Sequence, residues 1–152
     1  MTIQYLTQVK ENPILRGFKN EQMTMSEIAK LELKYNNGNQ FSKAFREFLF
    51  LAGEFNNFAF DLIDGIEELQ EYAKEDMEIA GQILNKPFFA FDVLDSIYSV
   101  ILLDEINPDP KVYLLMPFLA KGGSEPLLKP NGWDFTALVN ENIRRVKNNI
   151  SF

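Results

Sequence analysis

Hydrophobic residues recur at helical spacing in two neighbouring stretches of the first third of the chain. Thr24 followed by Glu27 has the spacing of a capping box, which predicts a helix that begins near residues 24–26 and stops at residues 37–38. A second helix is predicted from Ser42, and Gly53 is placed to end it. Aromatic and aliphatic side chains make one stripe along this second helix, so it should pack against a core.

A third and longer helix is predicted from Asp64 to the stop at residues 85–87. Its apolar positions should face inward while its many acidic side chains face water. The predicted inward positions are Ile66, Leu69, Tyr72, Ala73, Ile79, Ile83 and Leu84.

Strand-like runs follow at residues 88–91, 97–103 and 111–116, which are rich in aromatic and β-branched residues. The turn-rich residues 104–110 predict a hairpin loop between the last two strands. A short strand is also predicted within the aromatic residues 55–62.

Three prolines and three glycines predict a surface loop over residues 117–133, after which Asp134 caps a final helix. Residues 1–23 are interpreted as an N-terminal extension or arm. Helices that are segregated from adjacent hairpin strands indicate an α+β fold, in which N-terminal helices and a C-terminal helix flank an antiparallel sheet. The length of 152 residues predicts a single domain over residues 1–152.

The composition removes most catalytic and metal-binding chemistry, because the chain has neither cysteine nor histidine. Thiolate nucleophiles, histidine bases and the commonest zinc ligands are thereby excluded, so we expect no enzyme activity, no cofactor and no metal. Neither a signal peptide nor an apolar run long enough to span a bilayer is visible, which predicts a cytoplasmic protein with no membrane association.

Negative charge is concentrated in the middle of the chain. The net charge is −7, and residues 54–105 contain 13 acidic but only 2 basic side chains. Such a block repels nucleic acid and anionic membranes, and it favours a basic protein partner.

Eight carboxylates at the centre of this block form the candidate partner-binding surface. They are Asp61, Asp64, Glu67, Glu68, Glu71, Glu75, Asp76 and Glu78. Two interpretations stay open: a solvated helix face, or a surface that attracts a basic protein by mimicking a phosphate backbone. Tight binding would also need aromatic anchors, for which Phe55, Phe58 and Tyr98 are candidates unless they belong to the core.

Other motifs favour ordinary structural roles. A calcium loop centred on Gly65 fails because Phe60 and Leu62 would stand at ligand positions. The glycine pair at residues 122–123 lacks the rest of a phosphate-binding loop and predicts a surface turn. Carboxylates for a glycosidase-type reaction are present only at the predicted strand ends, as Asp92, Asp95, Asp104 and Glu105.

Three segments give the chain a resemblance to the SUKH superfamily of Smi/Knr-type domains. They are Ser26-Glu27-Ile28, then residues 41–49 followed by Gly53, and then residues 104–113, which include Asp109-Pro110-Lys111-Val112-Tyr113; residues 133–138 also look like the start of that family's closing helix. The resemblance implies an α+β fold. For a bacterial member it also implies an immunity protein that binds and neutralises a toxin, often a nuclease or deaminase.

The leading hypothesis is therefore a non-enzymatic immunity-type domain that binds a basic cognate toxin as a monomer or weak dimer. The alternative is an intracellular regulatory scaffold of the Smi/Knr type. A carboxylate-based hydrolase is the third hypothesis, disfavoured by the missing histidine.

Overall fold

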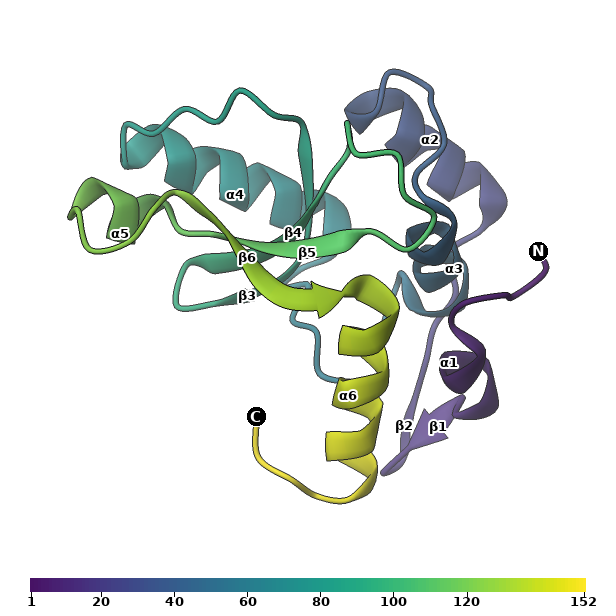
Figure 1. The fold of residues 1–152 in the computed structure, drawn as a ribbon. Helices are drawn as coiled ribbons and strands as arrows, with labels where there is room; N and C mark the ends of the chain where they lie inside the picture. Colours follow the sequence, from purple (N-terminus) through teal and green to yellow (C-terminus); the bar gives the residue numbers. More distant parts are fainter. The chain divides into compact units, whose positions relative to one another are not determined.

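The computed structural model describes all 152 residues and confirms the α+β class, with six helices and two antiparallel sheets (Figure 1). Its contacts divide the chain into two compact units. The helical unit comprises residues 1–60, 106–110 and 134–152, and the sheet unit comprises residues 61–105 and 111–133. That residues 1–152 behave as one domain stays a prediction.

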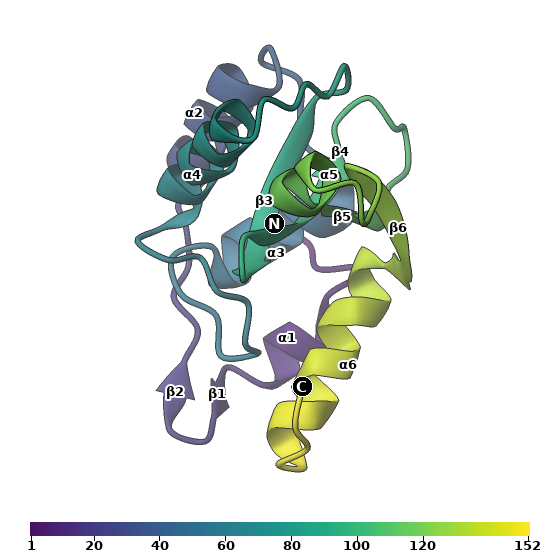
Figure 2. The same cartoon turned by 90° about the vertical axis from the view of Figure 1, so that its left-hand side faces the viewer.

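The helical unit contains four helices and a small hairpin. They are α1 (Thr7–Glu11), β1 (Ile14–Leu15), β2 (Phe18–Lys19), α2 (Met25–Tyr35), α3 (Lys43–Ala52) and α6 (Phe135–Lys147). The segment interpreted as an arm thus holds α1 and the β1–β2 hairpin, and α1 lies beside α6 (Figure 2). Leu6 and Val9 are buried, which anchors this segment in the unit's core.

Five phenylalanines form the centre of the helical unit. Phe45 and Phe48 of α3 pack against Phe135 at the start of α6, with ring centroids 5.3 and 5.7 Å apart. Phe58 and Phe60 complete the cluster, 5.3 Å from each other. Most of these pairs are edge-to-face, the geometry in which the positive edge of one ring meets the negative face of another.

A buried carboxylate fixes the first residues of the chain. Glu47 of α3 is fully buried, and its Oε1 accepts backbone N–H bonds from Gln4, Tyr5 and Leu6 at 3.0, 2.8 and 3.0 Å. Its Oε2 lies 3.6 Å from Nζ of Lys43. Three donors and one cation thus surround the charge, which burial without partners would make very costly.

Both predicted helix signals in residues 24–53 are confirmed. The Thr24 hydroxyl accepts the Glu27 N–H at 3.1 Å, while the Glu27 carboxylate accepts the Thr24 N–H at 2.7 Å. Gly53 ends α3 where a Cβ would lie only 2.5 Å from the Leu49 carbonyl oxygen and 2.7 Å from Sδ of Met23. Glycine is required here by close approach and not by its backbone angles.

The sheet unit holds a four-stranded antiparallel sheet in the order β3-β4-β5-β6. Its elements are α4 (Ile66–Ile79), β3 (Phe88–Leu94), β4 (Ile97–Leu102), β5 (Lys111–Leu115), α5 (Pro117–Lys121) and β6 (Leu128–Asp134). The predicted hairpin is confirmed, since β4 pairs with β5 through Tyr98 opposite Leu115.

The predicted surface loop over residues 117–133 is wrong, because this segment contains α5 and most of β6. Its prolines and glycines occupy positions where regular structure tolerates them. Pro117 is in the first turn of α5, where its missing N–H is not needed, and Gly122 caps that helix. Pro130 and Gly132 lie in β6, an edge strand of the sheet.

The third predicted helix is shorter than expected. α4 starts after Gly65, not with Asp64 as a side-chain cap, and it ends at Ile79 because Gly81 adopts a left-handed φ of +65°. Ile83 is consequently 83% exposed instead of facing inward. The strand predicted within residues 55–62 is also absent, since Ala59 has a φ of +69° and only Phe55 forms a bridge.

One buried side chain joins α4 to the sheet. Gln70 is 2% exposed, and its Nε2 donates to the carbonyl oxygens of Ile66 at 2.8 Å and Ala90 at 2.7 Å. Its Oε1 accepts the Ala90 N–H at 2.6 Å. The glutamine therefore satisfies both backbone groups of Ala90, a residue of the edge strand β3 beside a register shift.

Replacing Gln70 with alanine should lower the free energy of unfolding by about 2–4 kcal/mol, because both polar groups of Ala90 would be buried without partners. Urea unfolding followed by circular dichroism measures the change. Gln82→Ala is the matched control, since Gln82 is partly exposed and donates only one long bond of 3.4 Å. Equal losses in the two variants would contradict this role of Gln70.

Candidate functional site

The eight predicted acidic residues lie together on α4 and the turn before it, all within the sheet unit. Seven are exposed and Asp76 is half-buried. The buried side of α4 is formed by Ile66, Leu69, Gln70, Ala73 and Met77. We call the opposite side of α4, with its glutamates at 67, 68, 71, 75 and 78, the acidic face.

The acidic face has little internal charge compensation. Lys74 is the only basic residue of α4, and its Nζ lies 3.8 Å from Glu71 in an exposed ion pair. Such a pair contributes little in water, so the surrounding field stays negative. Glu67 and Glu68 are in the first helical turn, where the helix dipole favours negative charge.

Two tyrosines hold carboxylates of this region in place. The Tyr72 hydroxyl donates to Asp64 at 3.2 Å, and this bond raises the pKa of Tyr72 above its usual value. The Tyr98 hydroxyl donates to Asp76 at 2.6 Å, and its pKa is raised chiefly by burial and then by this bond. Both tyrosines therefore stay protonated as donors at neutral pH.

Three exposed apolar residues accompany the acidic face. Tyr72 and Ile79 of α4 are 39% and 59% exposed, and Ile63 in the preceding turn is 46% exposed. The helical stripe predicted that Tyr72 and Ile79 face inward, and this is wrong for both. Tyr72 lies outside the buried side of α4, where its hydroxyl donates to Asp64, and Ile79 is the last residue of the helix.

Ile63 is held in a backbone conformation that β-branched residues avoid. Its φ is +57°, in the left-handed region. Two hydrogen bonds hold this turn: the Ile63 N–H donates to Asp61 at 2.8 Å, and the Asp61 N–H donates to Asp92 at 2.7 Å. No sequence pattern predicts this strained, exposed isoleucine, because part of the constraint comes from Asp92, 29 positions further along the chain, through its bond to Asp61.

The three candidate aromatic anchors differ in exposure and in the unit to which they belong. Phe58 is fully buried in the aromatic cluster of the helical unit, and Tyr98 is buried in the sheet unit, so neither is available to a partner. Phe55 is exposed and belongs to the helical unit, where its ring lies 6.3 Å from that of Phe18.

The carboxylates considered for catalysis are dispersed along strand ends. Asp92 is half-buried in β3, and burial raises its pKa to about 6 despite the bonds from the backbone of Asp61 and Val93. Asp95 and Asp104 are exposed. The Tyr113 hydroxyl donates to Glu105 in a 2.5 Å hydrogen bond, which raises the pKa of Tyr113 to about 12.

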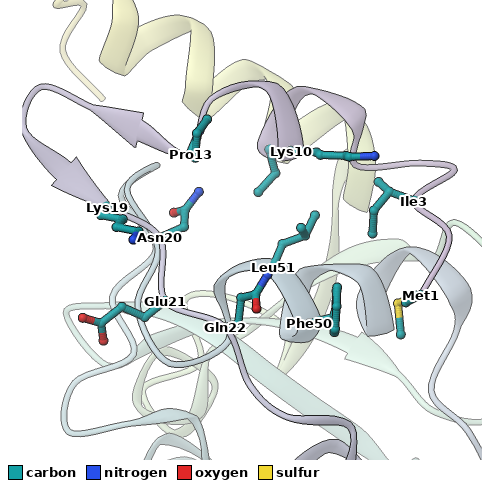
Figure 3. A pocket seen from close by; sticks show the side chains of 11 residues that line it. Met1, Ile3, Lys10, Pro13, Lys19, Asn20, Glu21, Gln22, Phe50 and Leu51 are labelled. Atoms are coloured by element: carbon teal, nitrogen blue, oxygen red, sulfur yellow. The ribbon is translucent and has the colours of Figure 1, made fainter.

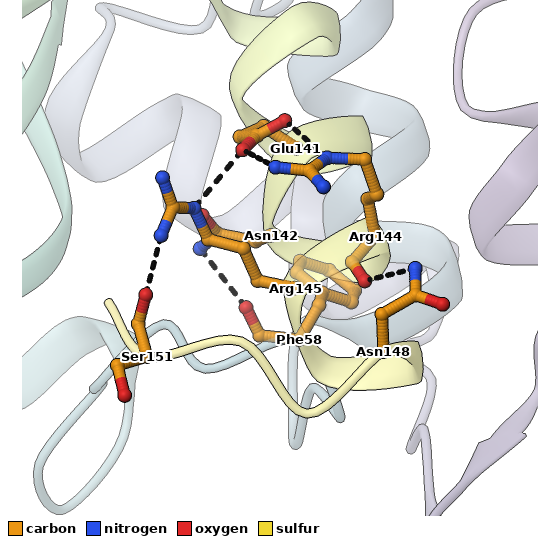
Figure 4. A network of polar contacts seen from close by, with 7 residues as sticks. All are labelled: Phe58, Glu141, Asn142, Arg144, Arg145, Asn148 and Ser151. Carbon is orange, nitrogen blue, oxygen red and sulfur yellow. Dashed lines mark hydrogen bonds and ion pairs between the residues drawn. The ribbon is translucent and has the colours of Figure 1, made fainter.

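The basic end of α6, in the helical unit, is partly compensated, because Glu141 offsets one of the three positive charges of Arg144, Arg145 and Lys147. Glu141 binds Arg144 at 2.6 Å and Arg145 at 3.0 Å, and these bonds, led by that from Arg144, lower the pKa of Glu141 to about 2 (Figure 4). Arg145 also donates to the Ser151 carbonyl, and Asn142 donates to the Phe58 carbonyl at 3.0 Å. These bonds hold the C-terminal end of α6 to other residues of the helical unit.

Comparison of the chain with protein-family models, curated proteins and solved structures found no match. No helix is both long and apolar enough to cross a membrane. No three side chains of the metal-ligating types Asp and Glu gather where they could hold an ion.

Replacing Asp92 with asparagine should stabilise the protein at pH 7 by about 1–3 kcal/mol, since the amide oxygen keeps the Asp61 bond and no buried charge is left. The pKa of the Asp92 carboxyl is about 6 in the folded chain and 3.8 in the unfolded chain, so between pH 4 and 6 the folded state binds the extra proton. Stability of the native chain from this group therefore falls as pH rises from about 4 to 6. The advantage of Asp92→Asn should vanish near pH 4.

Unfolding curves in urea at pH 4, 5, 6 and 7 measure this dependence. Asp95→Asn is the control, because Asp95 is exposed and asparagine tolerates its left-handed φ of +52°. If the difference in unfolding free energy between Asp92→Asn and the native chain is the same at every pH, the buried-charge interpretation is contradicted.

Proposed function

We propose that this chain is a non-catalytic protein-binding domain whose acidic face on α4 binds a basic protein. The observation that supports this most directly is the combination on one helix of five exposed glutamates, a single lysine, and the exposed side chains of Tyr72 and Ile79. A merely solvated face would need the charges but not the apolar side chains.

The two kinds of side chain serve different steps of binding. Glutamates attract a basic surface over several ångströms and raise the rate of encounter. Apolar and aromatic side chains that become buried on contact supply most of the affinity. Ile63 fits the second role, because backbone strain combined with side-chain exposure is typical of functional positions.

We further propose an immunity-type role, in which the partner is a basic toxin domain of the nuclease or deaminase kind. Support comes from the resemblance to the SUKH superfamily in residues 26–28, 41–49 and 104–113, and from the α+β fold that this resemblance implies. An enzyme that acts on nucleic acid needs positive charge at its active site, and an acidic surface can occupy it.

Charge reversal at Glu71, Glu75 and Glu78 together should slow association with the partner at least about tenfold at low salt. Lysine at these positions in the later turns of α4 suits the helix dipole, so the fold should persist. The partner is captured from the source cells with the native chain, and association is then followed by biolayer interferometry.

The matched control reverses Glu11, Glu21 and Asp104, which are exposed and lie off α4. It adds the same six units of positive charge to a chain of net charge −7. Equal association rates for both triple variants would overturn the acidic-face proposal. A captured partner that does not harm cells lacking this chain would overturn the immunity role while leaving the binding role in place.

Tyr72→Ala should weaken the complex by about tenfold or more, mainly by faster dissociation, if its ring is a buried anchor. Tyr72→Phe removes only the hydrogen bond to Asp64 and should change the dissociation rate by less than about threefold. Dissociation measured for both variants separates ring contact from hydrogen bonding. An unchanged rate in Tyr72→Ala would exclude this residue from the interface.

A further inference from the structure

The helical unit contains a hollow of about 690 Å³ between its N-terminal segment and α3 (Figure 3). Most of its lining is apolar, from Met1, Ile3, Val9, Pro13, Phe50 and Leu51. Pockets for small organic ligands usually measure about 300–1,000 Å³ and combine such a lining with a few placed polar groups. The polar groups therefore decide what this hollow would take.

Asn20 supplies a buried hydrogen-bond donor at this hollow. It is 9% exposed, and its Oδ1 accepts the Asn57 N–H at 2.7 Å. This bond fixes the amide orientation, because only the oxygen can accept. Nδ2 is left buried without any partner, and the side chain points toward the space beside Pro13 (Figure 3). A ligand acceptor placed there would satisfy a group that is otherwise costly to bury.

Basic side chains also line the same hollow. Lys10 and Lys19 line it, are exposed, and form no ion pair. Glu21 is the only acidic residue of the lining, and its carboxylate points away from the hollow in Figure 3. The acceptor that suits Asn20 is therefore an anionic one.

The rest of the lining argues for a hydrocarbon body. A bound peptide would bring one N–H and one C=O per residue, and Val9, Pro13 and Leu51 offer side chains that cannot satisfy them. A hydrocarbon chain needs no such partners and gains from leaving water.

We propose that the hollow binds a small monocarboxylate with an apolar chain. Its carboxylate accepts from Nδ2 of Asn20 and lies near Lys19, while its chain lies along Leu51 and Phe50. The wall is formed before binding, because the Glu47 carboxylate holds the backbone of residues 4–6. A pre-formed site lowers the ordering cost of binding.

The test uses decanoate and decanol, which share one chain and differ in the carboxylate. Both are added to the full chain below their aggregation limits, and binding is followed by amide and side-chain shifts in ¹⁵N NMR spectra. We expect decanoate to shift the Asn20 side-chain amide and the residues of the lining, and decanol to bind at least about tenfold more weakly.

Asn20→Asp is the decisive variant. Its remaining oxygen can still accept the Asn57 N–H, but the donor that faces the hollow becomes an acceptor. Decanoate affinity should fall at least about tenfold. Lys19→Gln provides a second test at an exposed position and should weaken decanoate about two- to fivefold, whereas Lys30→Gln on α2 should leave it unchanged.

Equal binding of decanoate and decanol, no binding of either, or shifts confined to other parts of the chain would each overturn the proposal. So would full decanoate affinity in Asn20→Asp, whatever the result for Lys19→Gln. The triple variant at Glu71, Glu75 and Glu78 should keep decanoate binding, so the failure of this proposal and the failure of the acidic-face proposal are distinguishable.

Discussion

The acidic face depends on one buried amide, the side chain of Gln70. Through its paired bonds with Ala90 it fixes which side of α4 packs on the edge strand β3, and so which side faces solvent. An aliphatic side chain could fill the same space at several helix rotations. A side chain that must hydrogen-bond to one N–H and one C=O permits a single rotation of α4 about its axis. That rotation places all the glutamates of the acidic face toward solvent.

Buried polar side chains also fix the backbone in the helical unit. The Glu47 carboxylate collects three consecutive backbone N–H groups and thereby replaces secondary structure for residues 4–6. Glu32 does the same on a smaller scale, accepting the Phe41 N–H at 2.7 Å beside Arg46. Irregular backbone is thus held by side chains, and the hollow beside residues 1–22 keeps its shape without a regular element on every side.

Local signals in the sequence predicted the parts of the fold that depend on neighbouring residues. The capping box at Thr24 and Glu27 and the β4–β5 hairpin depend on residues close in sequence, and both are confirmed. The stop at Gly53 is confirmed too, although Met23 as well as Leu49 leaves no room for a Cβ there. Proline and glycine misled the interpretation of residues 117–133, because their effect depends on whether an N–H is needed at that position.

The candidate site was predictable in its charges and not in its apolar partners. A run of carboxylates on a helix is expected to face water from the sequence alone, because acidic side chains are rarely buried without a partner. Tyr72 lies at the surface with its hydroxyl bonded to Asp64, and the strained turn at Ile63 is held partly by Asp92 in a distant strand. The same holds for Asn20, whose unpartnered amide follows from its pairing with Asn57.

The aromatic cluster has a consequence for the order in which the chain folds during synthesis. Phe45, Phe48, Phe58 and Phe60 leave the ribosome early, whereas Phe135, which packs against Phe45 and Phe48, follows about 75 positions after Phe60. Every residue of the sheet unit is made before this last ring arrives. The core of the helical unit therefore stays incomplete while the sheet unit is synthesised, and during this interval its aromatic side chains are exposed to aggregation.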